Sequence, residues 1–259
     1  MFRTRRASYV LGLLHGNLAI GLSYGWWIDK HNRHHAHPNA VDEDPDINPG
    51  IMVYAEGQSG SRRGLVKAWT RAQAFVFLPL LLLEGLNLHV SSLRALRAGT
   101  VRARRLEGAL LLAHLVGYAV VVLVVLPPLQ AAVFVAVQQG VFGLYMGASF
   151  APNHKGMRVV RPGDQLDYLR RQILTSRDVR GGRFVDFVFG GLNYQIEHHL
   201  FPSMPRPSLR RAQHVVREFC DEYGVSYCET SLWNSYRQTL RHLHRVAAPT
   251  ATLAPDSAA

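Results

Sequence analysis

The stretch ALLLAHLVGYAVVVLVVLPPLQAAVFVAVQQGVFGLYMGASF, residues 109–150, contains two apolar blocks, 109–127 and 129–150, that meet at a pair of prolines. Each block has about the 20 residues that a helix needs to cross a bilayer. The proline pair favours a tight turn between the blocks. The stretch therefore predicts a spanning hairpin, and the fold class that we expect is all-α, an integral membrane helical bundle with a helical cap.

Positive charge is concentrated just before this hairpin. The chain has 29 Lys and Arg residues against 18 Asp and Glu residues, a net charge of +11. Segment 94–107 alone holds Arg94, Arg97, Arg102, Arg104 and Arg105. Loops rich in Lys and Arg stay on the cytoplasmic side of a membrane. We therefore expect the polar segment 28–71 and the part after residue 154 to form a cap whose functional side faces the cytoplasm.

The charge also bears on the partners of the chain. A strongly basic surface suits either nucleic acid or anionic lipid. The apolar blocks favour membrane lipid, and basic residues are not interleaved with the aromatics on which single strands stack. We expect no nucleic-acid partner. The two cysteines, Cys220 and Cys228, match neither a C-x-x-C motif nor a disulfide framework.

Two further apolar segments, about 7–27 and 72–93, are interrupted by polar side chains. Such segments are typical of interfacial or re-entrant helices rather than of full spans. From 158 to 246 the chain is polar and basic with apolar residues at helical spacing, which predicts amphipathic helices. We expect one membrane domain over residues 1–246 and a disordered tail over 247–259.

Two histidine clusters share one pattern. His31, His34 and His35 read H-x-x-H-H, and Gln195, His198 and His199 read Q-x-x-H-H. Positions i, i+3 and i+4 lie on one face of a helix, so each cluster directs its side chains to one point. Neutral imidazole binds iron, zinc, copper and nickel. The zinc-protease signature H-E-x-x-H is absent, and so many histidines suit a site for two metal ions.

The remaining histidines stand alone, and a lone histidine is usually structural. His15, His89 and His114 lie in apolar segments, where we expect them to be hydrogen-bonded. His214, His242 and His244 lie on basic amphipathic stretches, where we expect them to be solvated.

The sequences KHNRHHAHPN (30–39) and NYQIEHHLFPSMPR (193–206) resemble the second and third histidine boxes of the membrane fatty acid desaturases. The Q-x-x-H-H form of the third box is similar to that of front-end desaturases and of some bacterial acyl-CoA desaturases. The resemblance extends from Phe2 to about Tyr223.

This resemblance implies a fatty acyl desaturase, an oxidoreductase of lipid metabolism. Such an enzyme uses two iron ions and O2 to introduce a cis double bond into the acyl chain of an acyl-CoA or acyl-lipid. Its electrons come from NAD(P)H through a reductase and a ferredoxin or cytochrome. The sequence does not fix the double-bond position or the acyl carrier. Alternatives are a related di-iron lipid hydroxylase and a truncated, non-catalytic desaturase paralogue.

The resemblance also implies roles for individual residues. The catalytic metal ligands would be His31, His34, His35, His198 and His199. His154, in GASFAPNHKGM, fits the lone ligand that follows the last spanning helix in the family. Gln195, Asp29 and Glu197 are expected to lie behind the ligands and to orient imidazoles.

The sequence departs from the family pattern at its start. The first histidine box, H-x-x-x-H, and the spanning helices before it are absent from these 259 residues. An upstream start, a truncated product and a partner chain that supplies the box are three explanations. No haem-binding HPGG segment is present, so we expect a separate electron carrier. The Arg-rich surface would dock an acidic carrier or lie against anionic lipid headgroups.

Overall fold

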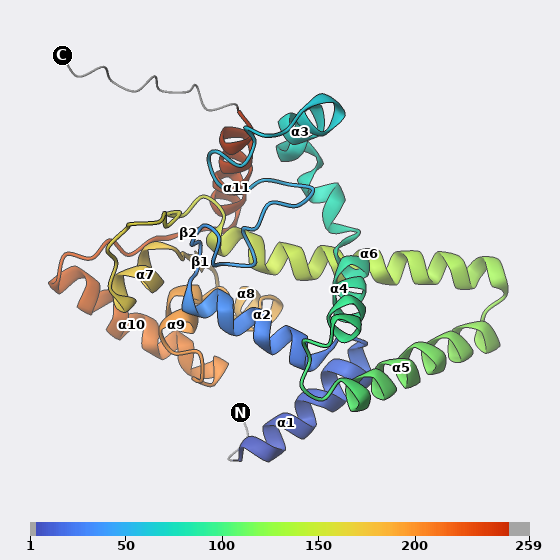
Figure 1. The fold of residues 1–259 in the computed structure, drawn as a ribbon. Helices are drawn as coiled ribbons and strands as arrows, with labels where there is room; N and C mark the ends of the chain where they lie inside the picture. Colours follow the sequence, from blue (N-terminus) through green and yellow to red (C-terminus); the bar gives the residue numbers. More distant parts are fainter. Residues whose placement is uncertain (1–3, 249–259) are drawn as a thin grey trace. The chain divides into compact units, whose positions relative to one another are not determined.

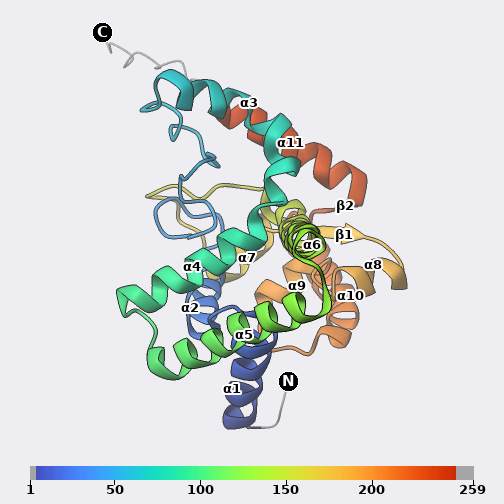
Figure 2. The same ribbon diagram turned by 90° about the vertical axis from the view of Figure 1, so that its right-hand side faces the viewer.

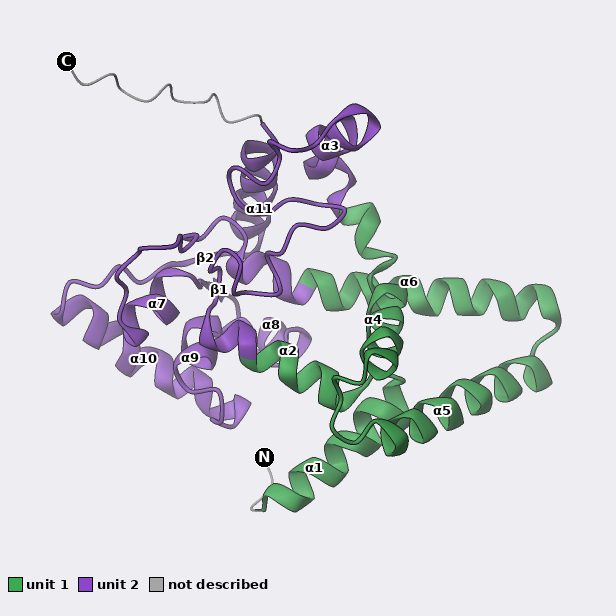
Figure 3. Cartoon of the chain, in the orientation of Figure 1, with its two compact units in different colours: residues 1–32, 78–148 green, residues 33–77, 149–259 purple. Residues whose placement is uncertain are grey.

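The computed structural model describes residues 4–248 and divides the chain into two compact units (Figure 3). Unit 1 comprises residues 1–32 and 78–148, and unit 2 comprises residues 33–77 and 149–259. The regular structure of residues 4–248 is helical except for two short strands, which confirms the all-α class. From residue 249 onward the predicted tail lies outside the described residues, and a single domain over 1–246 stays a prediction.

Unit 1 contains one of the two long apolar helices of residues 4–248 and most of the other, and Figure 1 labels its elements. Its elements are α1 (Arg5–Leu13), the π-helix η1 (Leu14–Ile20), most of α2 (Tyr24–Ala36), α4 (Glu84–Ala98), α5 (Arg104–Val125) and most of α6 (Pro128–His154).

Helices α5 and α6 form the predicted hairpin, and a short turn joins them (Figure 2). Both are long and apolar enough to cross a membrane. Pro128 is the first residue of α6, where its missing N–H and fixed φ favour the start of a helix. The apolar segment 72–93 is broken at Leu82 and Leu83, between α3 (Gly64–Leu81) and α4. The broken pair counts as at most one further span, and its re-entrant placement stays a prediction.

A buried carboxylate holds the start of unit 1 against α5. Glu107 is 1% exposed, and its Oε2 accepts hydrogen bonds from Ser23 Oγ (2.6 Å), Asn17 Nδ2 (3.1 Å) and the Gly25 N–H (3.2 Å). The Asn17 that interrupts the apolar segment 7–27 is thus a buried partner of this carboxylate. Gly21 ends η1 with φ +82°, a backbone conformation that glycine adopts without strain.

The isolated histidines of unit 1 have the structural role that we predicted. Nδ1 of His89 lies 2.8 Å from the Gly21 carbonyl oxygen, and Nδ1 of His114 lies 2.9 Å from that of Leu18. Nδ1 of His15 contacts the carbonyl of Leu11, one turn earlier in the chain. Each ring therefore donates to a backbone oxygen close to η1.

Unit 2 contains the polar helices predicted for 158–246. Its elements are the last turn of α2, most of α3, the end of α6, α7 (Tyr168–Leu174), α8 (Arg183–Val188), α9 (Gln195–Leu200), α10 (Arg206–Glu222), α11 (Leu232–Ala247) and two short strands, β1 (Asp178–Arg180) and β2 (Glu229–Ser231).

Helix caps and one small core fix these elements. The side chains of Asp167 and Ser231 accept the backbone N–H groups of Arg170 and Asn234 at the starts of α7 and α11. Strands β1 and β2 pair in parallel. The core joins α7, α9 and α10, and its buried members are Ile173, Ile196, Val216 and Cys220. It holds α9, which carries Gln195, His198 and His199, in place.

Candidate metal centre

Three buried imidazoles from three helices of unit 2 converge on one point. His34 comes from the last turn of α2, His154 from the last turn of α6, and His199 from α9. Nε2 of His154 lies 3.1 Å from Nε2 of His199 and 3.3 Å from Nε2 of His34. One ring nitrogen from each residue lies within 4.8 Å of the other two, which is close enough for a shared metal ion.

Oxygen acceptors lie behind all three rings. Nδ1 of His34 is 3.0 Å from both carboxylate oxygens of Asp44. Nδ1 of His154 is 3.1 Å from the Thr175 carbonyl oxygen, and Nδ1 of His199 is 3.0 Å from Gln172 Oε1. Because these oxygens can only accept a hydrogen bond, the ring nitrogen that faces each of them, Nδ1, must carry the proton. The Nε2 lone pairs then point at the shared centre, as in histidine-ligated metal sites.

Burial keeps the rings of His154 and His199 neutral. The pKa of His154 and that of His199 lie well below the usual histidine value, chiefly because both rings are buried away from water. Neighbouring imidazoles lower both pKa values further. Neutral imidazole is the form that binds a metal.

A second pair of histidines adjoins this group. Nε2 of His35 lies 3.2 Å from Nε2 of His198. The rings of His35 and His199 are stacked, with centroids 4.2 Å apart. Five of the six predicted histidine ligands therefore lie in one cluster of unit 2.

Gln195 faces the cluster more directly than we expected. Its Nε2 lies 2.9 Å from Nε2 of His154, and its Oε1 accepts a hydrogen bond from Asn153 Nδ2 (3.1 Å). Asn153 is fully buried and also donates to the Leu192 carbonyl (3.0 Å). The end of α6 is thereby fixed to the start of α9, and Gln195 adjoins the ring nitrogens instead of lying behind them.

Glu197 lies in a different environment from the one that we expected. Its Oε1 accepts a hydrogen bond from the Tyr227 hydroxyl (2.9 Å), which is also 2.7 Å from Asp178 Oδ2. Burial, with Asp178 close by, raises the pKa of Glu197 to about 9. The physical reason is helical geometry, since successive residues point about 100° apart and Glu197 precedes His198. The Asp178 carboxylate also accepts the Ile196 N–H (3.0 Å) and so caps α9.

His31 and Asp29 belong to unit 1. His31 lies one turn before His35 on α2, and its ring stacks on that of Trp27 with centroids 5.6 Å apart. Asp29 is exposed on the same helix. Their predicted roles rest on helical spacing and on resemblance.

Sequence reasoning missed four residues that support the imidazoles, namely Asp44, Gln172, Thr175 and Asn153. Asp44 lies in the acidic run DEDPD, ten residues after His34, and nothing in that run distinguishes the buried carboxylate from its exposed neighbours. Gln172 and Thr175 lie in a segment without a histidine pattern, and nothing in GASFAPNHKGM distinguishes Asn153 as a supporting residue. The expectation that His242 is solvated was wrong: it is 5% exposed, and its Nε2 donates to the Tyr54 carbonyl (2.8 Å). His214 and His244 are exposed, as predicted.

The donor set suits iron. It consists of imidazole nitrogens, backed by a carboxylate, an amide and a carbonyl, and iron is among the metals that imidazole binds. Within residues 4–248 neither cysteine belongs to a group of potential ligands. Two candidate spans and a buried cluster of histidines define, by class, a helical membrane protein with a candidate metal centre.

The comparisons identify the family. A family model described as Fatty acid desaturase matches residues 1–231. The chain belongs to the fatty acid desaturase family, which confirms the resemblance seen in the histidine boxes. This family implies a di-iron centre. Family membership and the two candidate spans together make the chain an integral membrane protein.

Several curated desaturases are similar to the chain. An acyl-lipid (9-3)-desaturase of Physcomitrium patens is 32% identical over 256 residues, which cover 95% of this chain and 48% of that protein. The Delta(6)-fatty-acid desaturase fat-3 of Caenorhabditis elegans is 29% identical over 260 residues, which cover 95% of this chain and 58% of that protein. The Delta(5) fatty acid desaturase fat-4 of the same organism is 30% identical over 264 residues, which cover 96% of this chain and 59% of that protein. The chain thus spans about half the length of the curated relatives it matches. No solved structure matches it.

Proposed function

We propose that the chain carries out fatty acyl desaturation, the O2-dependent introduction of a cis double bond into the acyl chain of an acyl-CoA or acyl-lipid. The observation that carries this proposal is the convergence of the His34, His154 and His199 Nε2 atoms on one point. The relatives named above are desaturases. No observation favours a hydroxylase or a non-catalytic protein.

The proposed ligands fall into two groups. His34, His154 and His199 hold one iron ion, and His35 and His198 hold a second. His31 is proposed as a further ligand on its helical spacing from His35 alone. When bound, the iron pair supplies the oxidising power that cleaves an unactivated C–H bond, which no side chain can supply.

The protein's own residues prepare the site. Asp44, Thr175 and Gln172 hold the Nδ1 protons, so that each ring turns its Nε2 toward the shared centre. Burial excludes water from His154 and His199, which favours neutral rings. Gln195 places an amide beside His154. The cytoplasmic orientation of this cluster remains part of the proposal and rests on the arginines of segment 94–107.

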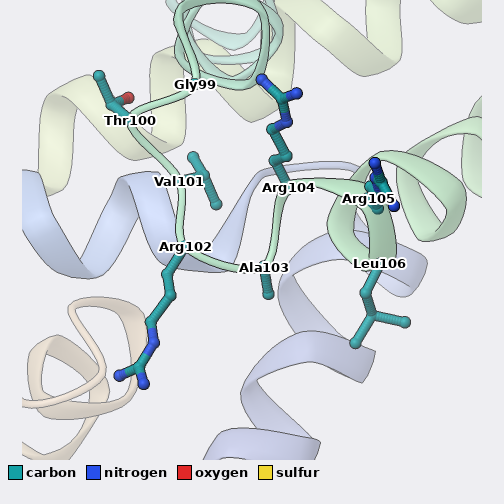
Figure 4. A pocket seen from close by; sticks show the side chains of 8 residues that line it. All are labelled: Gly99, Thr100, Val101, Arg102, Ala103, Arg104, Arg105 and Leu106. Carbon is teal, nitrogen blue, oxygen red and sulfur yellow. The ribbon is translucent and has the colours of Figure 1, made fainter.

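The same arginines suit a separate electron carrier, a ferredoxin or cytochrome reduced from NAD(P)H. All five are exposed, and none has a carboxylate within ion-pair distance among residues 4–248. Residues 99–106 line an open pocket of about 640 Å³ between α4 and α5. Figure 4 shows Arg102, Arg104 and Arg105 pointing in different directions around this turn. That spread fits an extended acidic surface better than a single anion.

The direct test is the acyl profile of cells that express the chain with an electron carrier. Gas chromatography with mass spectrometry should show an unsaturated product that depends on O2. His199→Ala should abolish the product, and His214→Ala, at an exposed position, should leave it unchanged. A hydroxylated product, or a product that persists in His199→Ala, would contradict desaturation at this centre.

A further inference from the structure

Helix α8 of unit 2 exposes two phenylalanines to solvent. Phe184 is 77% exposed and Phe187 is 82% exposed. They are three residues apart and therefore share one face of the helix. Aromatic side chains of this kind bury about 150–250 Å² each when they are covered. Two of them side by side on an exposed helix face indicate a surface that a membrane or another molecule covers.

The rest of α8 is fixed, so this exposure is a property of the fold. Val185 packs against the backbone of Gly181, where an added Cβ would lie 2.3 Å from the Cβ of Val185. Asp186 accepts a hydrogen bond from Asn193 Nδ2 (3.0 Å), and its carbonyl accepts the Gly191 N–H (2.9 Å). These contacts hold the opposite side of α8 to the segment that leads into α9.

This segment is joined to the end of a membrane-spanning helix. Helix α6 has 27 residues and is about 40 Å long, whereas the hydrocarbon core of a bilayer is about 30 Å thick. Its last turns therefore emerge at the level of the lipid headgroups. Asn153, in the last turn, donates to the Leu192 carbonyl, four residues after α8 ends.

The positive charge beside the two phenylalanines indicates that an anionic lipid surface covers them. Arg180 and Arg183 flank the aromatic face, are exposed, and have no ion-pair partner among residues 4–248. Cationic side chains beside aromatic rings are typical of segments that lie in the headgroup layer of an anionic membrane. Because α5 and α6 already tether the chain to the bilayer, α8 meets this surface at a high effective concentration.

We propose that α8 is a membrane-interface anchor, in which Phe184 and Phe187 insert into the boundary between headgroups and acyl chains, while Arg180 and Arg183 contact anionic headgroups. The anchor holds the segment before Gln195, His198 and His199 at the bilayer surface. It rests on the candidate spans and on the exposed face of α8, and not on the metal chemistry.

Fluorescence of the full chain in lipid nanodiscs tests this anchor. Phe187→Trp adds a tryptophan at the proposed depth, and its emission is obtained by subtracting that of the unmodified chain. Lipids brominated near the carboxyl end of the acyl chain should quench the added emission, since interfacial helices lie about 5–10 Å into this boundary. Glu222→Trp, at an exposed charged position, is the matched control and should be quenched by aqueous iodide instead.

Quenching of the Phe187→Trp emission by iodide would overturn the proposal, because the side chain would then face water. Insensitivity to both quenchers would also overturn it, since a protein surface would then cover α8. If Phe187→Trp does not fold, Phe184→Trp gives the same test on the same face. A double Arg180→Gln and Arg183→Gln change should weaken the bromolipid quenching in anionic nanodiscs and not in neutral ones.

Discussion

Nε2 of His154 and Nε2 of His199 lie 3.1 Å apart, while each ring donates from Nδ1 to a protein oxygen. Two neutral imidazoles in this arrangement turn lone pairs toward each other, which is unfavourable unless a cation or a donor lies between them. The Gln195 amide, whose Nε2 lies 2.9 Å from His154 Nε2, donates to one of these lone pairs, and the remaining ones favour positive charge at the centre of the cluster. A metal ion supplies that charge for all the converging rings at once.

Asp44 accepts a hydrogen bond from Nδ1 of His34, and it should therefore increase the affinity of the site for a metal ion. Asp44→Asn keeps the shape but weakens the acceptor for Nδ1 of His34, so the dissociation constant for iron should rise about 10- to 100-fold. Metal titration of the purified chain measures it. Asp42→Asn, at an exposed position of the same loop, should leave the affinity unchanged. Equal affinities for the two variants would show that Asp44 does not support the site.

Gln172 joins two histidine-bearing segments. Its Oε1 accepts from His199, and its Nε2 donates to the carbonyl of His35 (3.0 Å). Gln172→Leu leaves both groups buried and unpaired, which should lower the free energy of unfolding by about 1–3 kcal/mol. Thermal unfolding in detergent gives the readout, with Gln165→Leu at an exposed position as the control. Identical melting of the two variants would contradict the role of Gln172.

Glu107 should be critical for unit 1. Glu107→Ala leaves three donors without their shared acceptor, and it should destabilise the chain by about 3 kcal/mol or more. Glu107→Gln keeps one acceptor oxygen and should cost less. Resistance to protease in lipid bilayers measures both, against Glu222→Gln at an exposed position. Wild-type resistance of Glu107→Ala would rule out this anchoring.

Acid should weaken unit 2 through His242. Burial lowers the pKa of His242 to about 4, because the charged ring would lose its water. An unfolded histidine titrates near 6.5, so between pH 6.5 and 4 the unfolded state binds more protons than the folded state. The contribution of His242 is complete above pH 6.5 and is lost as the pH falls through that range. The loss is on the order of 1–3 kcal/mol.

Melting temperatures at pH 7.5 and pH 5 measure this loss. His242→Gln keeps a donor for the Tyr54 carbonyl and removes the titration, so it should flatten the pH dependence in this range. His244→Gln, at an exposed position, should retain it. If the melting temperature of His242→Gln fell between pH 7.5 and pH 5 as much as that of the unmodified chain, other groups would cause the pH dependence.

Periodic and local patterns made much of the fold predictable. The two apolar blocks and the proline pair gave α5, α6 and their turn, because span length and proline geometry act locally. The histidine spacings gave the faces of α2 and α9 for the same reason. The π-helix η1 was not predictable, since it depends on contacts with Glu107, about 90 residues further along the chain.

The imidazoles of the candidate site were predictable from the sequence, but the residues that hydrogen-bond to them were not. H-x-x-H-H and Q-x-x-H-H mark ring positions, and His154 followed from the family pattern. Asp44 and Gln172 reach the rings through tertiary folding, and many carboxylates and amides in this sequence look equivalent to them. Glu197 shows the converse, since its proximity to His198 in sequence places it on another side of the helix, beside Asp178 and Tyr227.

Iron content tests the metal centre most directly. The chain should be purified from membranes grown with iron and assayed by mass spectrometry of the metal, alongside His154→Ala and the exposed-site control His214→Ala. We predict that the unmodified chain and His214→Ala retain iron and that His154→Ala loses it. A chain without iron, or iron retained at the same level in His154→Ala, would contradict a metal centre built on the converging histidines.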